Sequence, residues 1–237
     1  MQLAFGSLIV LSLSAFSPEK QRFRVPILMY HYIQSLPPPR DRMGRGLTVT
    51  PKTFARQLDT LTEKGYQTID FATLARSGAT LPKKPILLTF DDGYDDAYSQ
   101  ALPVLLAHHM HATFYIVTGF VGTPHYVTWA ELKTMRDAGM DIAAHTVHHD
   151  DLRKLPAEKQ AKEILGSIKT LQENLSVRVQ SFAYPSGRHT NAAVRTLRSE
   201  GIPFAVTTRP GIASDRMNPL LLPRVRMKET TNLSIMF

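Results

Sequence analysis

Short apolar runs alternate with amphipathic helical segments along most of this chain, and this alternation limits what it can fold into. The run PILLTF at 85–90 is typical of a buried strand. The segment 50–65 starts with Thr50 as a helix cap, carries apolar residues at helical spacing and stops at Gly65. Strands that alternate with helices pack as parallel βα units, in layers or closed into a barrel. The sequence therefore predicts an α/β fold.

The expected elements follow one another with short connections. Strands are predicted at 25–33, 66–70, 85–90, 111–117, 140–146, 179–185 and 204–208, and helices at 50–65, 71–78, 95–110, 128–139, 157–175 and 191–201. The segment 34–46, QSLPPPRDRMGRG, is predicted to be a loop because Pro and Gly punctuate it. We find neither an internal repeat nor a Ser/Pro-rich linker, so one domain is expected.

Composition narrows the function classes. The 237 residues carry a formal charge of +8, which favours contact with anionic surfaces or leaves a solvated basic face. No basic run with interleaved aromatic residues is found, so a nucleic-acid partner is not expected. The chain has no cysteine, and any metal must therefore be held by His, Asp or Glu.

The first residues resemble a secretory signal. The apolar stretch from Leu3 to Phe16 ends near small residues, Ser14 and Ala15, and is too short to span a bilayer. No Lys or Arg precedes it, which leaves an uncleaved anchor or a packed first helix as alternatives. We expect 1–22 to be a signal peptide or anchor, 23–237 to be the catalytic domain, and the mature protein to be extracytoplasmic.

Polar side chains follow several of the predicted strands, where folds of this class place their chemistry. We expect one face to gather these residues: His31, Asp91, Asp92, His145, His149 and the loop 184–187. One carboxylate with two imidazoles is a common way to hold a divalent metal and leave positions open for catalysis. A cation would also neutralise the adjacent aspartates of FDDG. On spacing alone, His148 competes with His149 as a ligand.

Several motifs together resemble the polysaccharide deacetylases, the NodB-homology or carbohydrate esterase family 4 proteins. They are LLTFDDGY, TWAELKTMRDAGMDIAAHTVHHDDL, SFAYPSGR, FAVTTRPG and LLPRVRM, and the likeness runs from about Val25 to Met227. The opening PILMYH is most similar to the exopolysaccharide and poly-N-acetylglucosamine deacetylase branch. The resemblance implies a distorted (β/α) barrel and hydrolytic removal of N-acetyl groups from a glycan.

The resemblance also implies roles for individual residues. Asp92, His145 and His149 would bind the metal, most simply zinc, with cobalt or nickel as alternatives. Asp91 would be the general base, and His31 would donate a proton to the departing amine in place of a late Leu-x-His motif, which is missing here. A backbone N–H of the YPSG loop, that of Ser186, would stabilise the oxyanion.

Other positions have less specific assignments. Many family members carry an arginine where this chain has Ala183, and Arg209 is the candidate to orient the catalytic aspartate instead. The expected substrate-binding set is Tyr184, Pro185, Ser186, Gly187, Trp129 and Arg209, although an aromatic residue at an element boundary is as often part of the core. Asp95 and Asp96 are interpreted as charges at a helix start, and His108, His109 and His111 as surface or packing residues.

Three functions remain open at this point. The leading one is a metal-dependent hydrolase that removes N-acetyl groups from a glycan containing N-acetylglucosamine, with the cell envelope as a candidate place of association. An O-acetyl esterase acting on xylan would use the same groups, and a silent glycan-binding protein would keep the fold alone. The sequence gives neither the linkage of the glycan nor the oligomeric state.

Overall fold

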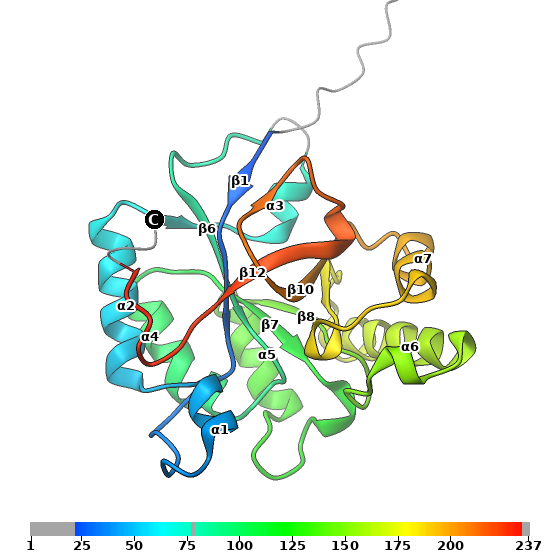
Figure 1. Ribbon diagram of the computed structural model, residues 1–237, viewed down its shortest axis with the longest axis horizontal. Coiled ribbons are helices and arrows are strands. Elements are labelled where there is room, and N and C mark those ends of the chain that lie inside the picture. Colours follow the sequence, from blue (N-terminus) through cyan, green and yellow to red (C-terminus); the bar gives the residue numbers. More distant parts are fainter. Residues whose placement is uncertain (1–21, 77–78, 234–237) are drawn as a thin grey trace, which may run out of the picture.

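A closed barrel of parallel strands forms the centre of the computed structural model, which describes residues 22–76 and 79–233 (Figure 1). The barrel strands are β2 (Ile27–Tyr30), β6 (Pro85–Phe90), β7 (Thr113–Ile116), β8 (Asp141–Ala144), β9 (Ser181–Ala183), β10 (Phe204–Pro210) and β12 (Leu222–Arg226). They pair in the order β2-β12-β10-β9-β8-β7-β6, and β2 pairs again with β6 to close the ring. The predicted (β/α) barrel is confirmed.

Short strands extend the barrel at its margins. β5 (Gln67–Thr68) adds to the outside of β6, β1 (Arg24–Val25) pairs with β11 (Ala213–Ser214), and β3 (Tyr32–Ile33) pairs with β4 (Thr48–Val49). The sequence had predicted one strand over 25–33; the structure divides it among β1, β2 and β3.

Alternate residues of the barrel strands face opposite sides. Leu87, Tyr115, Ala143 and Val206 belong to the cluster that fills the barrel interior. Their neighbours along each strand, such as Leu88, pack outward with the helices in the larger core. This two-sided burial explains why the strands read as continuous apolar runs.

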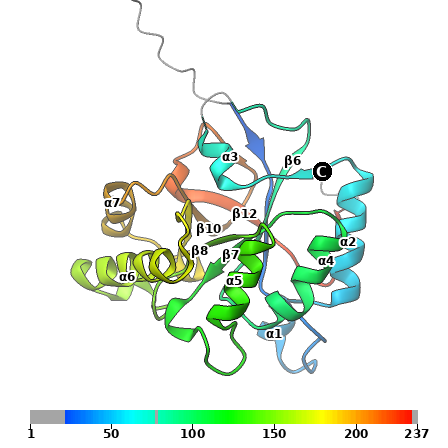
Figure 2. The same cartoon turned by 180° about the vertical axis from the view of Figure 1, so that it is seen from behind.

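Helices cover the outside of the barrel. They are α2 (Pro51–Glu63), α4 (Leu102–Ala107), α5 (Trp129–Asp137), α6 (Ala157–Leu175) and α7 (Asn191–Ser199). In both views α2 and α4 lie on one flank and α6 and α7 on the other (Figures 1 and 2). Within the part of the chain that the structure describes, no helix has the length and apolar character needed to cross a membrane.

The two ends of the barrel differ. α3 (Phe71–Ala75) lies at the end where strands begin, and Phe71 and Leu74 join the interior cluster there. α1 (Arg42–Leu47) lies at the opposite end, where the strands finish (Figure 1). The sequence analysis had read 34–46 as loop, which was wrong for its second half: Asp41 accepts a hydrogen bond from Gly44 N and starts this short helix.

Two further elements differ from the sequence prediction. The helix expected at 95–110 is a π-helical turn, Ala97–Ala101, followed by α4. β12 was not predicted as a strand because Pro223 interrupts it, and proline cannot donate to a sheet ladder. It nevertheless lies between β10 and β2, and the register shifts beside it. The expected signal segment, apart from its last residue, Arg22, lies outside the described residues.

Candidate active site

One cleft at the C-terminal end of the barrel contains most of the polar residues that follow the strands. Its volume is about 580 Å³. His31 lies between β2 and β3, Asp91 and Asp92 follow β6, and His145 and His149 follow β8. The lining set is His31, Arg42, Met43, Gly46, Leu47, Asp91, Asp92, Tyr94, His145, His149, Ser186, Thr208, Arg226 and Lys228.

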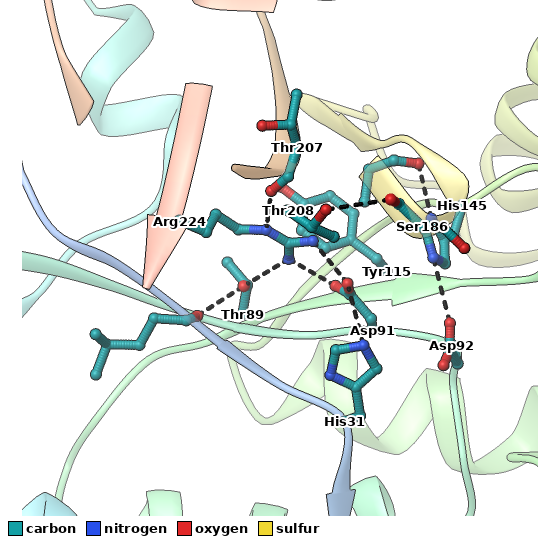
Figure 3. Close-up of polar contacts among 12 residues, drawn as sticks. His31, Thr89, Asp91, Asp92, Tyr115, His145, Ser186, Thr207, Thr208 and Arg224 are labelled. Atoms are coloured by element: carbon teal, nitrogen blue, oxygen red, sulfur yellow. Dashed lines mark hydrogen bonds and ion pairs between the residues drawn. The ribbon is translucent and has the colours of Figure 1, made fainter. Parts of the chain in front are cut away.

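Asp91 is bound at both carboxylate oxygens by one arginine. Arg224 Nη1 donates to Oδ1 at 2.7 Å and Nη2 donates to Oδ2 at 2.6 Å (Figure 3). Burial alone would raise the pKa of Asp91, but the charge and hydrogen bonds of Arg224 outweigh it and hold the pKa well below its usual range. Asp91 is therefore an ionised carboxylate with a fixed orientation.

Arg224 itself is fully buried inside the end of the barrel. Its guanidinium also donates to the carbonyl of Thr207 and to Thr89 Oγ1, both at 3.0 Å, and lies 5.7 Å from the centre of the Tyr115 ring (Figure 3). Because a buried charge is tolerated only when it is paired and hydrogen-bonded, these contacts explain how an arginine can occupy this position.

The side chain of Asp92 turns away from Asp91 and toward the two histidines. Its Oδ1 lies 3.3 Å from His145 Nε2 and 3.4 Å from His149 Nε2. One ligand atom of each of these three residues lies within 4.8 Å of the others, which is the only such group of His, Cys, Asp or Glu found among the described residues. Burial would raise the pKa of Asp92, but the neighbouring His145 side chain lowers it by more, so the net shift is downward.

The donor set fits a divalent cation. His145 Nδ1 is 2.7 Å from the carbonyl of Ala183, so this nitrogen carries the proton and Nε2 presents its lone pair toward Asp92. The backbone is held in the left-handed region at Asp92 (φ 74°), Thr146 (φ 67°) and His149 (φ 60°). Such conformations are costly for these residues and cluster at functional sites, where surrounding contacts impose them.

His148 is excluded from this group by its direction. Its Nδ1 pairs with Glu163 Oε1 at 2.7 Å, and Glu163 also accepts from the backbone N–H groups of Val147 and His148. Meanwhile His149 N donates to Thr146 Oγ1 at 3.0 Å, which turns the His149 ring inward. Of the two histidines that spacing left open, these contacts bring His149 and not His148 beside Asp92, and the ligand role of His149 stays a prediction.

His31 lies on the other side of Asp91. Its Nε2 is 3.8 Å from Asp91 Oδ2, and the residue is almost completely buried. Burial lowers the pKa of His31, and the opposing attraction of Asp91 does not cancel the effect. The imidazole is therefore mainly neutral at neutral pH and close enough to Asp91 to exchange a proton through a small movement or one water.

The loop 184–187 borders the cleft through Ser186 alone. Ser186 has φ 53°, and its carbonyl accepts from Thr208 Oγ1 at 3.1 Å (Figure 3). A Cβ at Gly187 would lie 2.4 Å from the backbone nitrogen of Thr208, so only glycine permits this close approach. Pro185 is buried behind the loop.

Besides Pro185 and Gly187, three more residues of the expected substrate-binding set do not line the cleft. Tyr184 is buried and its hydroxyl donates to the carbonyl of Leu220, and Trp129 packs against the outer core at the start of α5. Arg209 donates to the carbonyl of Leu221. The orienting role expected of Arg209 is therefore wrong in position: the arginine on Asp91 is Arg224.

The sequence analysis missed several residues of the cleft. Arg226 and Lys228 extend from the end of β12, and Arg42 and Met43 reach it from α1. A signal was present in LLPRVRM, because residues two apart on a strand face the same side. Once β12 is recognised, Leu222, Arg224 and Arg226 fall on the side that faces the interior and the cleft.

Comparison with known proteins agrees with this geometry. The family model described as Polysaccharide deacetylase matches residues 78–205. A Bacillus subtilis protein named as a polysaccharide deacetylase, YxkH, is 34% identical over 218 residues, which cover 90% of this chain and 75% of that protein. The poly-β-1,6-N-acetyl-D-glucosamine N-deacetylase of Escherichia coli K12 is 25% identical over 72% of this chain, but the match spans only 32% of its length.

Solved structures show the same fold. The Streptococcus pyogenes deacetylase PplD, determined in complex with acetate, superimposes with a TM-score of 0.82 at 32% identity. The match covers 89% of this chain and 95% of that one. The likeness therefore extends over nearly the whole barrel and includes the end that carries the cleft.

Proposed function

This chain belongs to the polysaccharide deacetylase family, carbohydrate esterase family 4, and we propose that it removes N-acetyl groups from a glycan that contains N-acetylglucosamine. One observation carries the proposal. A single cleft combines an arginine-bound aspartate, a neighbouring histidine and a group of one aspartate with two histidines. These are the groups that hydrolysis of an amide with metal assistance requires.

Asp92, His145 and His149 would hold the metal. The set of two imidazoles and one carboxylate suits zinc, with cobalt and nickel as alternatives, and leaves coordination positions for water and substrate. A divalent cation held there would supply Lewis acidity to the acetamido carbonyl and lower the pKa of water beside it. The hydrogen bond of His145 to the carbonyl of Ala183 would keep this ligand oriented.

Asp91 and His31 would carry the proton from the attacking water to the departing amine. Asp91 is ionised and oriented by Arg224, so it can accept the proton of the attacking water, although its low pKa makes it a weak and transient base. His31 is mainly neutral and must gain a proton before it can give one. With 3.8 Å between them, the proton can pass from Asp91 to His31 and on to the departing amine.

The negative charge that develops on the acetyl oxygen when water attacks the acetyl carbon needs a hydrogen-bond donor. Ser186 borders the cleft and its backbone N–H is our candidate. The poly-N-acetylglucosamine deacetylase among the relatives supports this substrate class. We propose that the protein acts on envelope or matrix glycan outside the cytoplasm, as the apolar start of the sequence also suggests.

The test is acetate release by the zinc-loaded protein. Oligomers of β-1,6-linked N-acetylglucosamine, chitin oligomers and acetylated xylan should be compared side by side. We expect acetate from an N-acetylglucosamine oligomer, and a fall of roughly 10²–10⁴-fold in Asp91→Asn. Acetate from xylan alone would replace the proposal by the esterase, and no acetate from any of them would leave a binding protein.

A further inference from the structure

A second pocket adjoins the catalytic cleft, separated from it by Tyr94, which lines both. Its volume is about 410 Å³. Four segments contribute: β3, the chain that leads into α1, the loop after β6 and the loop before α5. We call it the tyrosine pocket, and its lining includes Tyr32, Tyr94, Tyr126, Asp41, Asp95 and Asp96.

Three tyrosine rings form a continuous stack along this pocket. Tyr32 stacks on Tyr94 with 4.0 Å between ring centres, and Tyr94 is followed by Tyr126 at 5.1 Å. The backbone beneath is tied down, because Asp95 N donates to the carbonyl of His125 at 3.0 Å and Tyr94 bridges to Tyr126. The stack is therefore built before any ligand arrives.

The charge of the tyrosine pocket is opposite to that of its surroundings. Three aspartates line it, and neither Lys nor Arg is among its described lining residues. The chain as a whole carries +8, and the cleft beside it is lined by Arg42, Arg226 and Lys228. An acidic pocket on a basic protein favours a cationic group over an anionic one.

Asp96 is the second feature that points to a cation. The residue is 6% exposed, its Oδ2 accepts from Ile33 N at 3.0 Å, and its Oδ1 has no hydrogen-bond partner among the described residues. Burial raises its pKa to about 7. A buried carboxylate without a full set of partners is costly, and a positive charge in the adjoining pocket would offset that cost.

The sequence analysis assigned Asp95 and Asp96 to a helix start, and the structure gives Asp96 a different contact. Asp96 precedes the π-helical turn but makes no side-chain capping bond to it. Its carboxylate reaches across to β3 instead. Asp96 therefore stands at the helix start as expected, but its carboxylate bonds to β3 and not to the turn that it precedes.

We propose that the tyrosine pocket binds a glucosaminium unit, a sugar of the same glycan chain that has already lost its acetyl group. The inference rests on the proposed function. Because the pocket and the cleft share Tyr94, adjacent parts of one glycan can occupy both. The carboxylates of the pocket attract the ammonium group beside the tyrosine stack, whereas an N-acetylated unit would bring no charge. The enzyme then prefers chains that are already partly de-N-acetylated.

Direct binding tests the pocket. Calorimetry on the full zinc-loaded protein would compare the glucosamine trimer with the tri-N-acetylated trimer, in β-1,6 and β-1,4 linkage, at low salt. We expect the amine trimer to bind at least about 10-fold more tightly in one linkage, and to lose about 10-fold in Asp95→Asn and Tyr126→Ala. Asp137→Asn is the matched control, because Asp137 is exposed and pairs with Arg136 outside the pocket.

Kinetics separates this inference from the proposed function. For wild type, kcat/KM should be about 10-fold higher on a partly deacetylated hexamer than on the fully acetylated one; Asp95→Asn should bring this ratio near one, and Asp137→Asn should keep it. Acetate release with a wild-type ratio of one, or equal binding of both trimers, overturns the inference alone. Absence of acetate from every glycan overturns the proposed function, and the calorimetry then still decides whether the pocket selects an amine.

Discussion

Replacing Arg224 by methionine removes the partner of Asp91 and leaves the carboxylate buried. Met fills a similar volume but can donate to none of the groups that Arg224 binds, which are both Asp91 oxygens, Thr89 Oγ1 and the Thr207 carbonyl. Both members of the ion pair are almost completely buried, so solvent compensates little.

The magnitude follows from the pair. Two charges about 4 Å apart at an effective dielectric constant of about 20 attract by about 4 kcal/mol. Breaking a buried pair by removing one partner usually costs about 3–5 kcal/mol in the free energy of unfolding. We expect Arg224→Met to lose about 4 kcal/mol at neutral pH.

The titration of Asp91 determines how this loss of stability changes with pH. In the wild type its pKa is lowered, so the pair contributes stability above the ordinary range of a carboxyl and loses it as pH falls through the lowered value. In Arg224→Met, Asp91 is still buried but has lost the positive charge that lowered its pKa. The pKa of Asp91 therefore rises above its value in the unfolded chain. The variant therefore gains from protonation, and its deficit relative to wild type should narrow between pH 7 and pH 4.

Urea unfolding with a chelator present, at several pH values, measures both effects without a contribution from bound metal. Arg226→Met is the control, because Arg226 lies on the same strand, is only partly buried and makes no ion pair within the described part of the chain. Arg224→Met combined with Asp91→Asn should recover part of the loss. An Arg224→Met deficit no larger than that of Arg226→Met, or one that does not change with pH, would refute this reasoning.

Three further outcomes are expected. Asp92→Ala should weaken zinc binding by more than the roughly 10–100-fold that is typical when a residue bonded to a metal ligand is lost. His148→Ala should leave zinc binding unchanged. Elemental analysis after dialysis measures both, and zinc loss in His148→Ala would show that the wrong histidine has been chosen. His31→Gln should slow amide hydrolysis far more than hydrolysis of an activated aryl ester, whose leaving group needs no proton, and equal losses would remove His31 from proton delivery. Asp96→Asn should stabilise the fold by about 1–3 kcal/mol at pH 8 and by little at pH 4. Burial raises the pKa of Asp96 to about 7, so the folded protein bears the cost of ionising this carboxyl only at higher pH. A gain in urea unfolding that did not depend on pH would contradict this.

The fold class could be predicted because the barrel strands are buried on both faces and so read as apolar runs. The rule that chemistry lies at the carboxyl ends of such strands predicted that His31, Asp91 and His145 meet on one face, and all three line one cleft. Pro223 concealed β12, however, and with it Arg224. Arg209 was therefore predicted as the orienting arginine, but it binds a carbonyl elsewhere.

Local backbone conformation was the other feature that could not be predicted from the sequence. His148 and His149 are adjacent and of the same type, so periodicity cannot rank them. The difference arises from the left-handed backbone at Thr146 and His149 and from Glu163, which holds His148 outward. Neither a positive φ at a non-glycine residue nor a contact from a helix 15 residues further along the chain leaves a readable pattern.

The adjacent acids Asp91 and Asp92 show how one step of backbone separates two tasks. Asp91 N still donates to the carbonyl of Tyr30 at 3.0 Å, so Asp91 continues the ladder of β6 and faces the interior, as Leu87 and Thr89 do. That direction leads to Arg224. Asp92, at φ 74°, has left the strand, and its carboxylate meets the histidines instead. Repulsion between the two carboxylates is therefore offset by separate positive partners, which are Arg224 for Asp91 and, in our proposal, a metal for Asp92. Loss of the metal should thus leave the orientation of Asp91 unchanged.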